Sequence, residues 1–206
     1  MFNLGRLPRL SRLLPLMRAV VLPLLVLAAC SHTPSPDYPL LRYTYLTPLR
    51  LNVASIEIDD SWVPDDPADV SRLSPESPED ALKQMAHDRL IASGTSGRAV
   101  YKIEDAGIRR EGPWLYGHLA VKLSLSDADG QHTGFAEASV ARNVGVPEEG
   151  GDVALRQTLY DMTKAMMDNM NVEFEYQVRH SLHDWLQETS PGSSAVPSPV
   201  EQQPLN

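Results

Sequence analysis

His180, His183 and Asp184 have the residue types and spacing of a metal site. The two histidines stand three residues apart, so on a helix their side chains would share one face, with Asp184 directly beside them. Zinc sites usually take three or four such ligands, and the chain has no cysteine pair to supplement these. A solvated helix end explains the group better, and we predict no metal ligand here.

Asp127, Asp129 and Gly130 resemble the opening of a calcium-binding loop. Such a loop needs a third acid two residues further on and a glutamate at its twelfth position, and neither is present. Aspartate and glycine in this order are also typical of a tight turn between two strands. We therefore predict a hairpin turn.

A third group consists of acids close together in the segment DDSWVPDDPADV. These carboxylates could meet a basic partner or a divalent cation, although a solvated loop is the commoner reason for such a run. The residues concerned are Asp59, Asp60, Asp65, Asp66 and Asp69.

No catalytic motif is present, and we predict neither catalytic residues nor a cofactor. In Gly94-Thr95-Ser96-Gly97 the second glycine follows the serine directly, which differs from a nucleophile elbow. The sequence has no phosphate loop, dinucleotide fingerprint or zinc-protease pair. A row of methionines could form an adaptable binding face, but core packing explains them better. These are Met162, Met166, Met167 and Met170.

The only cysteine, Cys30, ends an N-terminal segment with the layout of a secretory signal. Four arginines occupy residues 6–18, and residues 19–29 are apolar and end in small side chains. A membrane-spanning helix needs about 20 apolar residues, roughly twice this run, which also contains Pro23. The segment therefore predicts export from the cytoplasm.

The residues Leu27-Ala28-Ala29-Cys30 resemble the lipobox of bacterial lipoproteins. This resemblance implies that the signal is cut between Ala29 and Cys30, that the Cys30 sulfur carries a diacylglycerol, and that the new amino end is acylated. Aspartate after the cysteine often signals retention in the inner membrane, and Ser31 in its place favours the outer membrane. The alternatives are an ordinary signal peptide with an incidental cysteine, or an uncleaved anchor.

The charge of the chain excludes nucleic acid as a partner. Residues 1–29 hold four of the 18 basic residues and no acid, so the remainder has 27 acidic and 14 basic residues and a net charge of −13. A body of this charge repels phosphate backbones. With a single cysteine there is no internal disulfide, and stability must come from the core.

The chain divides into four parts by composition. Residues 1–29 form the signal peptide, and residues 30–48 form the attachment site with a tether whose segment SHTPSPDYP is too polar and proline-rich to pack. Residues 49–188 form the folded domain. Residues 189–206, rich in proline and serine, form a disordered tail.

Hydrophobic periodicity predicts an α+β domain with the order β-α-β-β-β-α. We expect strands at residues 49–58, 98–108, 114–126 and 133–142, in a mainly antiparallel sheet of about four strands packed against two helices. The first helix begins at Ser77 as N-cap, and Gly94 can end it. The second spans residues 152–187, and it either breaks near residues 169–172 or projects beyond the domain. On residues 134–140, small side chains would let a helix approach closely.

The body resembles the small α+β domains of periplasm-facing lipoproteins that assist envelope assembly or transport complexes. The features behind this are the lipobox at Cys30, the tether, the opening strand with LNVASIEI and the closing helix. The resemblance implies a non-catalytic lipoprotein that binds or scaffolds another envelope protein. Two alternatives are a membrane-tethered periplasmic hydrolase, which needs a pocket with converging groups, and an accessory lipoprotein of a lipid or solute transporter, which needs an apolar groove.

Overall fold

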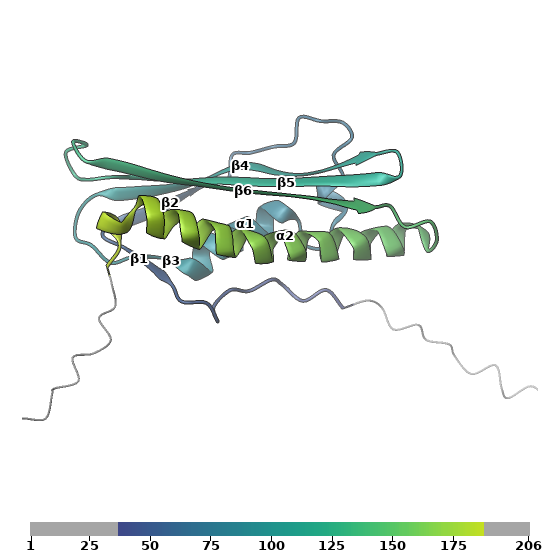
Figure 1. The fold of residues 1–206 in the computed structure, drawn as a ribbon, viewed down its shortest axis with the longest axis horizontal. Coiled ribbons are helices and arrows are strands. Elements are labelled where there is room, and N and C mark those ends of the chain that lie inside the picture. Colours follow the sequence, from purple (N-terminus) through teal and green to yellow (C-terminus); the bar gives the residue numbers. More distant parts are fainter. Residues whose placement is uncertain (1–36, 188–206) are drawn as a thin grey trace, which may run out of the picture. The chain divides into compact units, whose positions relative to one another are not determined.

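A computed structural model describes residues 37–187 (Figure 1). Ala29 and Cys30, the rest of the predicted signal peptide and the tail of residues 189–206 lie outside the described residues. Among the helices that are described, none is long and apolar enough to cross a membrane.

The domain is a mixed four-stranded sheet with two helices on one face, which confirms the predicted α+β class (Figure 1). The strand order is β2 (Ser55–Asp59), β4 (Arg98–Glu111), β5 (Trp114–Ser126) and β6 (Thr133–Gly145). β4, β5 and β6 are antiparallel and joined by short turns, whereas β2 runs parallel to β4. The helices are α1 (Pro78–Arg89) and α2 (Gly151–Ser181). A short 3-10 helix, η2 (Ser71–Leu73), precedes α1.

Residues 49–58 do not form the single strand that was predicted. They divide into β1 (Leu49–Leu51) and β2, and β1 pairs in parallel with β3 (Leu90–Ala92) in a separate two-stranded sheet. The division follows a tight turn in which the Val53 N–H donates to the Leu51 carbonyl at 2.8 Å. α1 also ends earlier than Gly94, because Leu90 has extended backbone angles and begins β3.

α2 is continuous over 31 residues and neither breaks at residues 169–172 nor continues to residue 187. Met166, Met170 and Phe174 keep its buried face unbroken through the suspected break. Its length of about 46 Å matches strands of 13 residues, which extend about 43 Å. After Ser181 the chain turns into the 3-10 helix η3 (His183–Trp185).

The methionines of α2 belong to the core, as predicted. Met162, Met166, Met167 and Met170 are each at most 1% exposed.

Small residues on β6 bring α2 close to the sheet, also as predicted. A Cβ atom at Gly134 would lie 2.8 Å from Leu182 Cδ2 and 2.9 Å from Trp185 Nε1. Gly117 on β5 serves the same purpose, because a Cβ there would lie 2.6 Å from Met166 Sδ. A larger side chain at either position would push the helical layer away from the strands.

Residues 37–48, which the sequence assigns to the tether, lie against the helices, and we call this segment the strap. Leu41 and Tyr43 are buried in the core. The Leu41 N–H donates to the Glu76 carboxylate and the Tyr43 N–H to the Asp88 carboxylate, each at 2.8 Å. The Arg42 guanidinium adds two hydrogen bonds to Asp88, both at 2.9 Å. The ordered domain therefore begins before residue 49.

Candidate functional site

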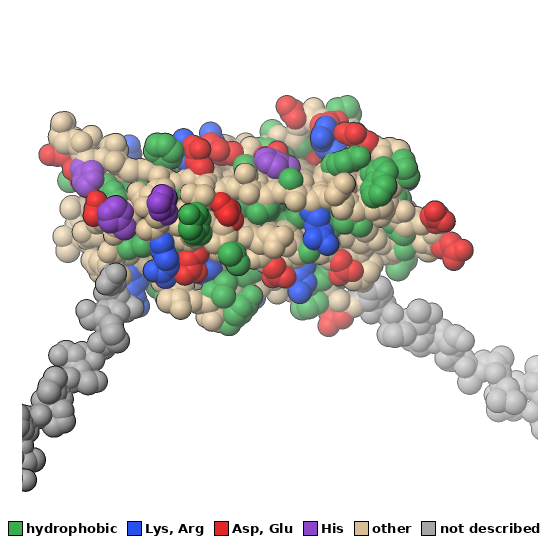
Figure 2. Space-filling view, in the orientation of Figure 1, with side chains coloured by type: hydrophobic (Ala, Val, Ile, Leu, Met, Phe, Trp, Pro, Cys, Tyr) green, Lys and Arg blue, Asp and Glu red, His purple; other side chains and the backbone are tan. Residues whose placement is uncertain are grey.

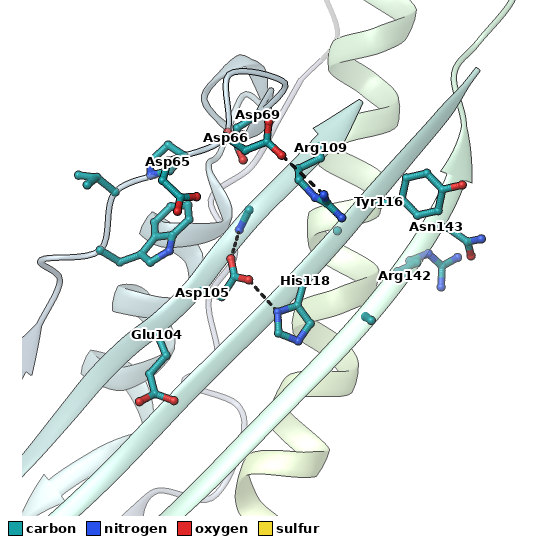
Figure 3. A pocket seen from close by; sticks show the side chains of 16 residues that line it. Asp65, Asp66, Asp69, Glu104, Asp105, Arg109, Tyr116, His118, Arg142 and Asn143 are labelled. Atoms are coloured by element: carbon teal, nitrogen blue, oxygen red, sulfur yellow. Dashed lines mark hydrogen bonds and ion pairs between the residues drawn. The ribbon is translucent and has the colours of Figure 1, made fainter. Parts of the chain in front are cut away.

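The face of the sheet opposite the helices carries a groove of about 890 Å³ (Figure 3). Its floor is the outer face of β4, β5 and β6, and its wall is the loop of residues 60–70, which rises from that side of the sheet in Figure 1. We call this hollow the groove. Its polar lining consists of Asp65, Asp66, Asp69, Glu104, Asp105, Arg109, Tyr116, His118, Arg142 and Asn143.

Main-chain hydrogen bonds fix the loop where it returns to the sheet. β2 pairs with only the first residues of β4, which leaves the rest of that strand's edge open. The loop occupies this edge, with Val70 N–H donating to the Ile108 carbonyl at 2.8 Å and Arg110 N–H to the Ala68 carbonyl at 3.0 Å. The Asp69 carboxylate accepts the Ile108 N–H at 3.1 Å. The wall is thus anchored directly to the floor.

Trp62 forms the aromatic part of the wall and lies close to a glycine of the floor. A Cβ atom at Gly107 would lie 3.8 Å from Trp62 Cζ2 and 3.2 Å from an oxygen of Asp69. The indole therefore packs over the glycine while Val63 beside it remains 66% exposed. This leaves an apolar lip above a polar floor.

A bulge in β4 places Asp105 beside His118 on the floor. The register between β4 and β5 shifts between Ile103 and Asp105, and such bulges re-aim side chains and are common next to functional sites. Asp105 Oδ2 lies 2.8 Å from His118 Nδ1, and its Oδ1 accepts the Gly107 N–H at 2.9 Å. With Asp105 ionised, Nδ1 is the donor, so His118 Nε2 is left to accept or donate a hydrogen bond in the groove.

Arg109 makes two ion pairs, one with the wall and one within its own strand. Its guanidinium lies 3.6 Å from the Asp66 carboxylate and 3.3 Å from that of Glu111. The arginine side chain is 50% exposed, so these pairs contribute only about 0 to 1 kcal/mol to stability. A ligand can therefore replace these ion pairs at little cost in folding free energy.

The groove is acidic. Five carboxylates and two guanidinium groups line it, which gives a net charge of −3 when His118 is neutral. Clefts of one sign concentrate ligands of the opposite sign. The groove therefore favours a cationic ligand, and the faces of Trp62 and Tyr116 can contribute cation–π contacts to it.

The His118–Asp105 pair is also the arrangement in which a histidine acts as a general base. A carboxylate that fixes the imidazole tautomer stabilises the cation formed when Nε2 takes a proton. Among the residues that line the groove, however, there is no serine, threonine, cysteine or lysine to serve as a nucleophile. The pair could therefore act on water or on a group of the ligand itself.

The predicted acidic group does not form one site. Its last three members, Asp65, Asp66 and Asp69, lie in the groove wall. Asp59 ends β2 and accepts the Ser61 N–H at 3.1 Å, and Asp60 lies 3.5 Å from Lys83 of α1.

The predicted histidine group lies at the far end of α2 and is exposed. The ring of His180 stacks on that of Tyr176, with 5.9 Å between the ring centres, and His183 Nε2 lies 3.1 Å from Asp184. Within residues 37–187, no three histidine, cysteine or acidic side chains are placed to hold one metal ion.

Asp127, Asp129 and Gly130 form the predicted turn between β5 and β6. Gly130 has a φ of +73°, and the two carboxylates accept main-chain N–H groups, that of His132 at 3.0 Å and that of Gln131 at 3.1 Å. The segment Gly94-Thr95-Ser96-Gly97 connects β3 to β4, and its Ser96 carbonyl accepts the Ala54 N–H.

Asp105 and His118 are not among the residues predicted from the sequence. One signal does exist, because the buried positions Ala99, Tyr101 and Ile103 give way to Ala106 and Ile108, a slip of one residue that indicates a bulge. His118, in contrast, occupies an ordinary outward position of a regularly alternating strand. Its role depends on which residue the neighbouring strand places beside it.

Comparisons with known proteins add little to these observations. No model of a protein family matches the sequence, and no curated protein matches it significantly. A crystal structure of a Xanthomonas campestris protein under the family model DUF330 is similar over 70% of this chain and 97% of that one, with 11% identity and a TM-score of 0.34. A candidate lipoprotein from Caulobacter crescentus is similar over 59% and 88%, with 15% identity and a TM-score of 0.27. These TM-scores are too low to assign a fold or a function.

Proposed function

We propose that the protein is a bacterial envelope lipoprotein that binds another envelope protein through the groove and does not itself catalyse a reaction. The lipobox-like residues before Cys30 support attachment through lipid, with Ser31 favouring the outer membrane and the body in the periplasm. The observation that carries the binding role is the groove, an acidic hollow on a sheet face that the helices leave open.

The chemistry of the groove indicates the kind of partner. Its excess of carboxylates suits a segment rich in lysine or arginine, and His118 and Asn143 offer hydrogen bonds along the floor. The exposed Val63 and the indole of Trp62 provide apolar contact beside these charges. A basic, partly apolar segment of an envelope protein meets all three requirements, whereas nucleic acid does not.

A photo-crosslinking residue placed at Val63, in the intact lipoprotein within living cells, tests this role. We expect capture of a defined envelope protein at Val63 but not at Val153 of α2, which is similarly exposed at 61%. The charge reversals Asp65→Lys and Glu104→Lys should abolish the capture, because they would repel a basic segment. No hydrogen bond or ion pair within the described domain depends on either carboxylate, so the fold should be kept. Capture of the same protein from both positions, or capture unaffected by charge reversal, would contradict the proposal.

The membrane attachment has a separate test. Cys30→Ala should release the protein from membranes, because the substitution removes the sulfur to which the lipid would be attached. Continued tight membrane association would remove the basis for a lipoprotein.

A second candidate function, a membrane-tethered periplasmic hydrolase, is favoured by the His118–Asp105 pair. In this case His118 would take a proton from water, and Arg109 would face the developing negative charge. Incubation of the purified protein with peptidoglycan distinguishes the two functions, and we expect no soluble product. Product that forms with the native protein and disappears in both His118→Gln and Asp105→Asn would replace the binding role by an enzymatic one.

A further inference from the structure

The strap presents large apolar side chains to solvent in a fixed pattern. Leu40 and Tyr45 are each 73% exposed, while Leu41 and Tyr43 between them are buried. The carboxylates of Glu76 and Asp88 hold the main chain of the two buried residues. The outward direction of Leu40 and Tyr45 is therefore set by the core and not by a freely turning chain.

Further contacts align the strap with α2. Tyr160 donates its hydroxyl to the Pro39 carbonyl at 2.5 Å, and its ring centre lies 5.2 Å from that of Tyr38. At the other end, the Thr47 carbonyl accepts a hydrogen bond from Arg89, which also bonds Glu175 of α2. The strap thus follows the helix over about four turns and lies in the helical layer.

The neighbouring α2 also exposes apolar side chains. Val172 and Tyr176 are exposed by 72% and 60%. Figure 2 shows hydrophobic side chains interspersed with charged ones below the helices, on the side where the strap runs. We call Leu40 and Tyr45 the strap surface.

Most charges beside the strap surface are paired, unlike those of the groove. Arg42 pairs with Asp88 at 2.9 Å, Arg179 with Glu175 at 2.8 Å, and Lys164 with Asp168 at 3.8 Å. Asp37 and Asp161, near Tyr160, leave a small excess of negative charge. Anionic lipids are repelled less by such a surface than by the more acidic groove. Leucine and tyrosine are also side chains that enter the boundary between headgroups and acyl chains readily.

The short chain between Cys30, the predicted lipid attachment site, and the strap limits which surface of the domain can face the membrane. Asp37, the first residue of the strap, follows Cys30 by seven positions, a length of chain that spans at most about 25 Å. This is shorter than α2, which extends about 46 Å. A lipid on Cys30 therefore keeps the strap near the headgroups.

We propose that the strap surface rests on the lipid bilayer that carries the Cys30 lipid, so that the groove opens away from the membrane. Leu40 and Tyr45 belong to a strap that follows α2 over about four turns, which favours contact along the length of the helix over contact at one end. This inference rests on the proposed lipidation of Cys30. It assigns one face of the domain to lipid and the opposite face to a partner.

Cysteine labelling tests the orientation in the lipidated full-length protein. Cys30 is the only cysteine, and its thiol is consumed by the lipid, so a second cysteine takes a fluorescent label specifically. Leu40→Cys and Tyr45→Cys, labelled with a polarity-sensitive dye, are reconstituted into vesicles of phosphatidylethanolamine and phosphatidylglycerol. The matched control is Val63→Cys, which is similarly exposed but lies on the groove wall.

We expect the labels at residues 40 and 45 to emit at shorter wavelength than the label at residue 63, and to be quenched several-fold more by spin-labelled lipid. If the protein floats with the vesicles but all three labels report water, the inference is overturned and lipidation stands. If it does not float, the proposed attachment fails as well. Shielding of residues 40 and 45 that requires a second envelope protein would make that protein the occupant and overturn the assignment to lipid.

Discussion

The two faces of the four-stranded sheet are made by alternate residues of the same strands, yet they differ in packing. On the helical side, Leu115, Leu119 and Leu123 of β5 are fully buried. On the other side of the same strand, Tyr116 and His118 are 36% and 49% exposed and border the groove. One face holds the fold together and the other is exposed at the groove. A substitution should therefore affect stability when its side chain points toward the helices, and the groove when it points to the opposite side.

Two arginines make the contrast most clearly. Arg89 of α1 is completely buried, where it bonds Asn171 at 2.9 Å and Glu175 at 2.6 Å. Arg109 of β4 is half exposed at the groove and makes longer ion pairs. Burial raises the cost of losing a partner, since the group left behind can no longer be solvated.

Arg89→Met should therefore cause the largest loss, about 3 kcal/mol of unfolding free energy, because the buried Asn171 loses its partner, whereas Glu175 is 33% exposed and keeps Arg179. Arg109→Met should cost less than about 1 kcal/mol. Urea denaturation followed by circular dichroism measures both. Equal losses for the two variants would break the distinction between the faces.

Gly134→Ala tests how closely the helical side is packed. The added methyl would come within 2.9 Å of atoms of Leu182 and Trp185, and we expect a loss of about 1 to 3 kcal/mol. Gly145→Ala on the same strand is the matched control, because the nearest atom to the added methyl, the Pro113 carbonyl oxygen, would be 4.0 Å away. Its effect should stay within about 0.5 kcal/mol. Thermal unfolding of the two variants compares their stabilities. If Gly134→Ala were as stable as the native protein, the helical layer could move to accommodate the added methyl.

Glu76→Gln sharpens the comparison through its pH dependence. Burial raises the pKa of Glu76 above its ordinary value, against the hydrogen bond from Leu41 and aided by the charge of Asp80. Between the pKa of the unfolded chain and the higher pKa of the folded one, the folded state binds more protons, so this residue's contribution to stability falls as pH rises. Glutamine cannot ionise, and its amide oxygen still accepts from Leu41. The variant should be more stable than the native protein above this window, with the difference vanishing below it.

Asp88 holds the strap at a second point, and its contribution to stability should depend on pH in the opposite direction to that of Glu76. Asp88→Asn tests this. Burial opposes ionisation of Asp88, but hydrogen bonds from Arg42, the Tyr43 N–H and Gln84 together lower its pKa. Its contribution to stability is then full above the ordinary aspartate pKa and is lost as pH falls below it. Urea midpoints measured from neutral to acidic pH give both profiles, and parallel profiles for the two variants would contradict this account.

Local pattern was enough to predict the strands at residues 98–108, 114–126 and 133–142, the start of α1 at Ser77 and the buried methionines of α2. Each of these depends on periodicity or capping that neighbouring residues express. The division of residues 49–58, the pairing of β1 with β3 and the packing of Leu41 and Tyr43 depend instead on residues about 35 to 45 positions away. No short window of sequence contains both partners of these contacts.

The candidate site was less accessible to prediction than the fold. Asp105 and His118 meet only because a bulge shifts the register of two strands, and the acids of the loop join them only because the loop pairs with the open edge of β4. The sequence left open whether α2 breaks or projects for a related reason. The length of the strands, which matches that of the helix, becomes apparent only once the sheet is assembled.

The strap has a mechanical consequence. In a chain held by lipid at Cys30, any pull between the membrane and the domain enters the fold at Asp37 and passes along the strap. The strap is fastened to the segment before α1 through Glu76, to α1 through Asp88 and to α2 through Tyr160. Tension on such an anchor would therefore be shared among three points of the helical layer, on the side of the sheet opposite the groove.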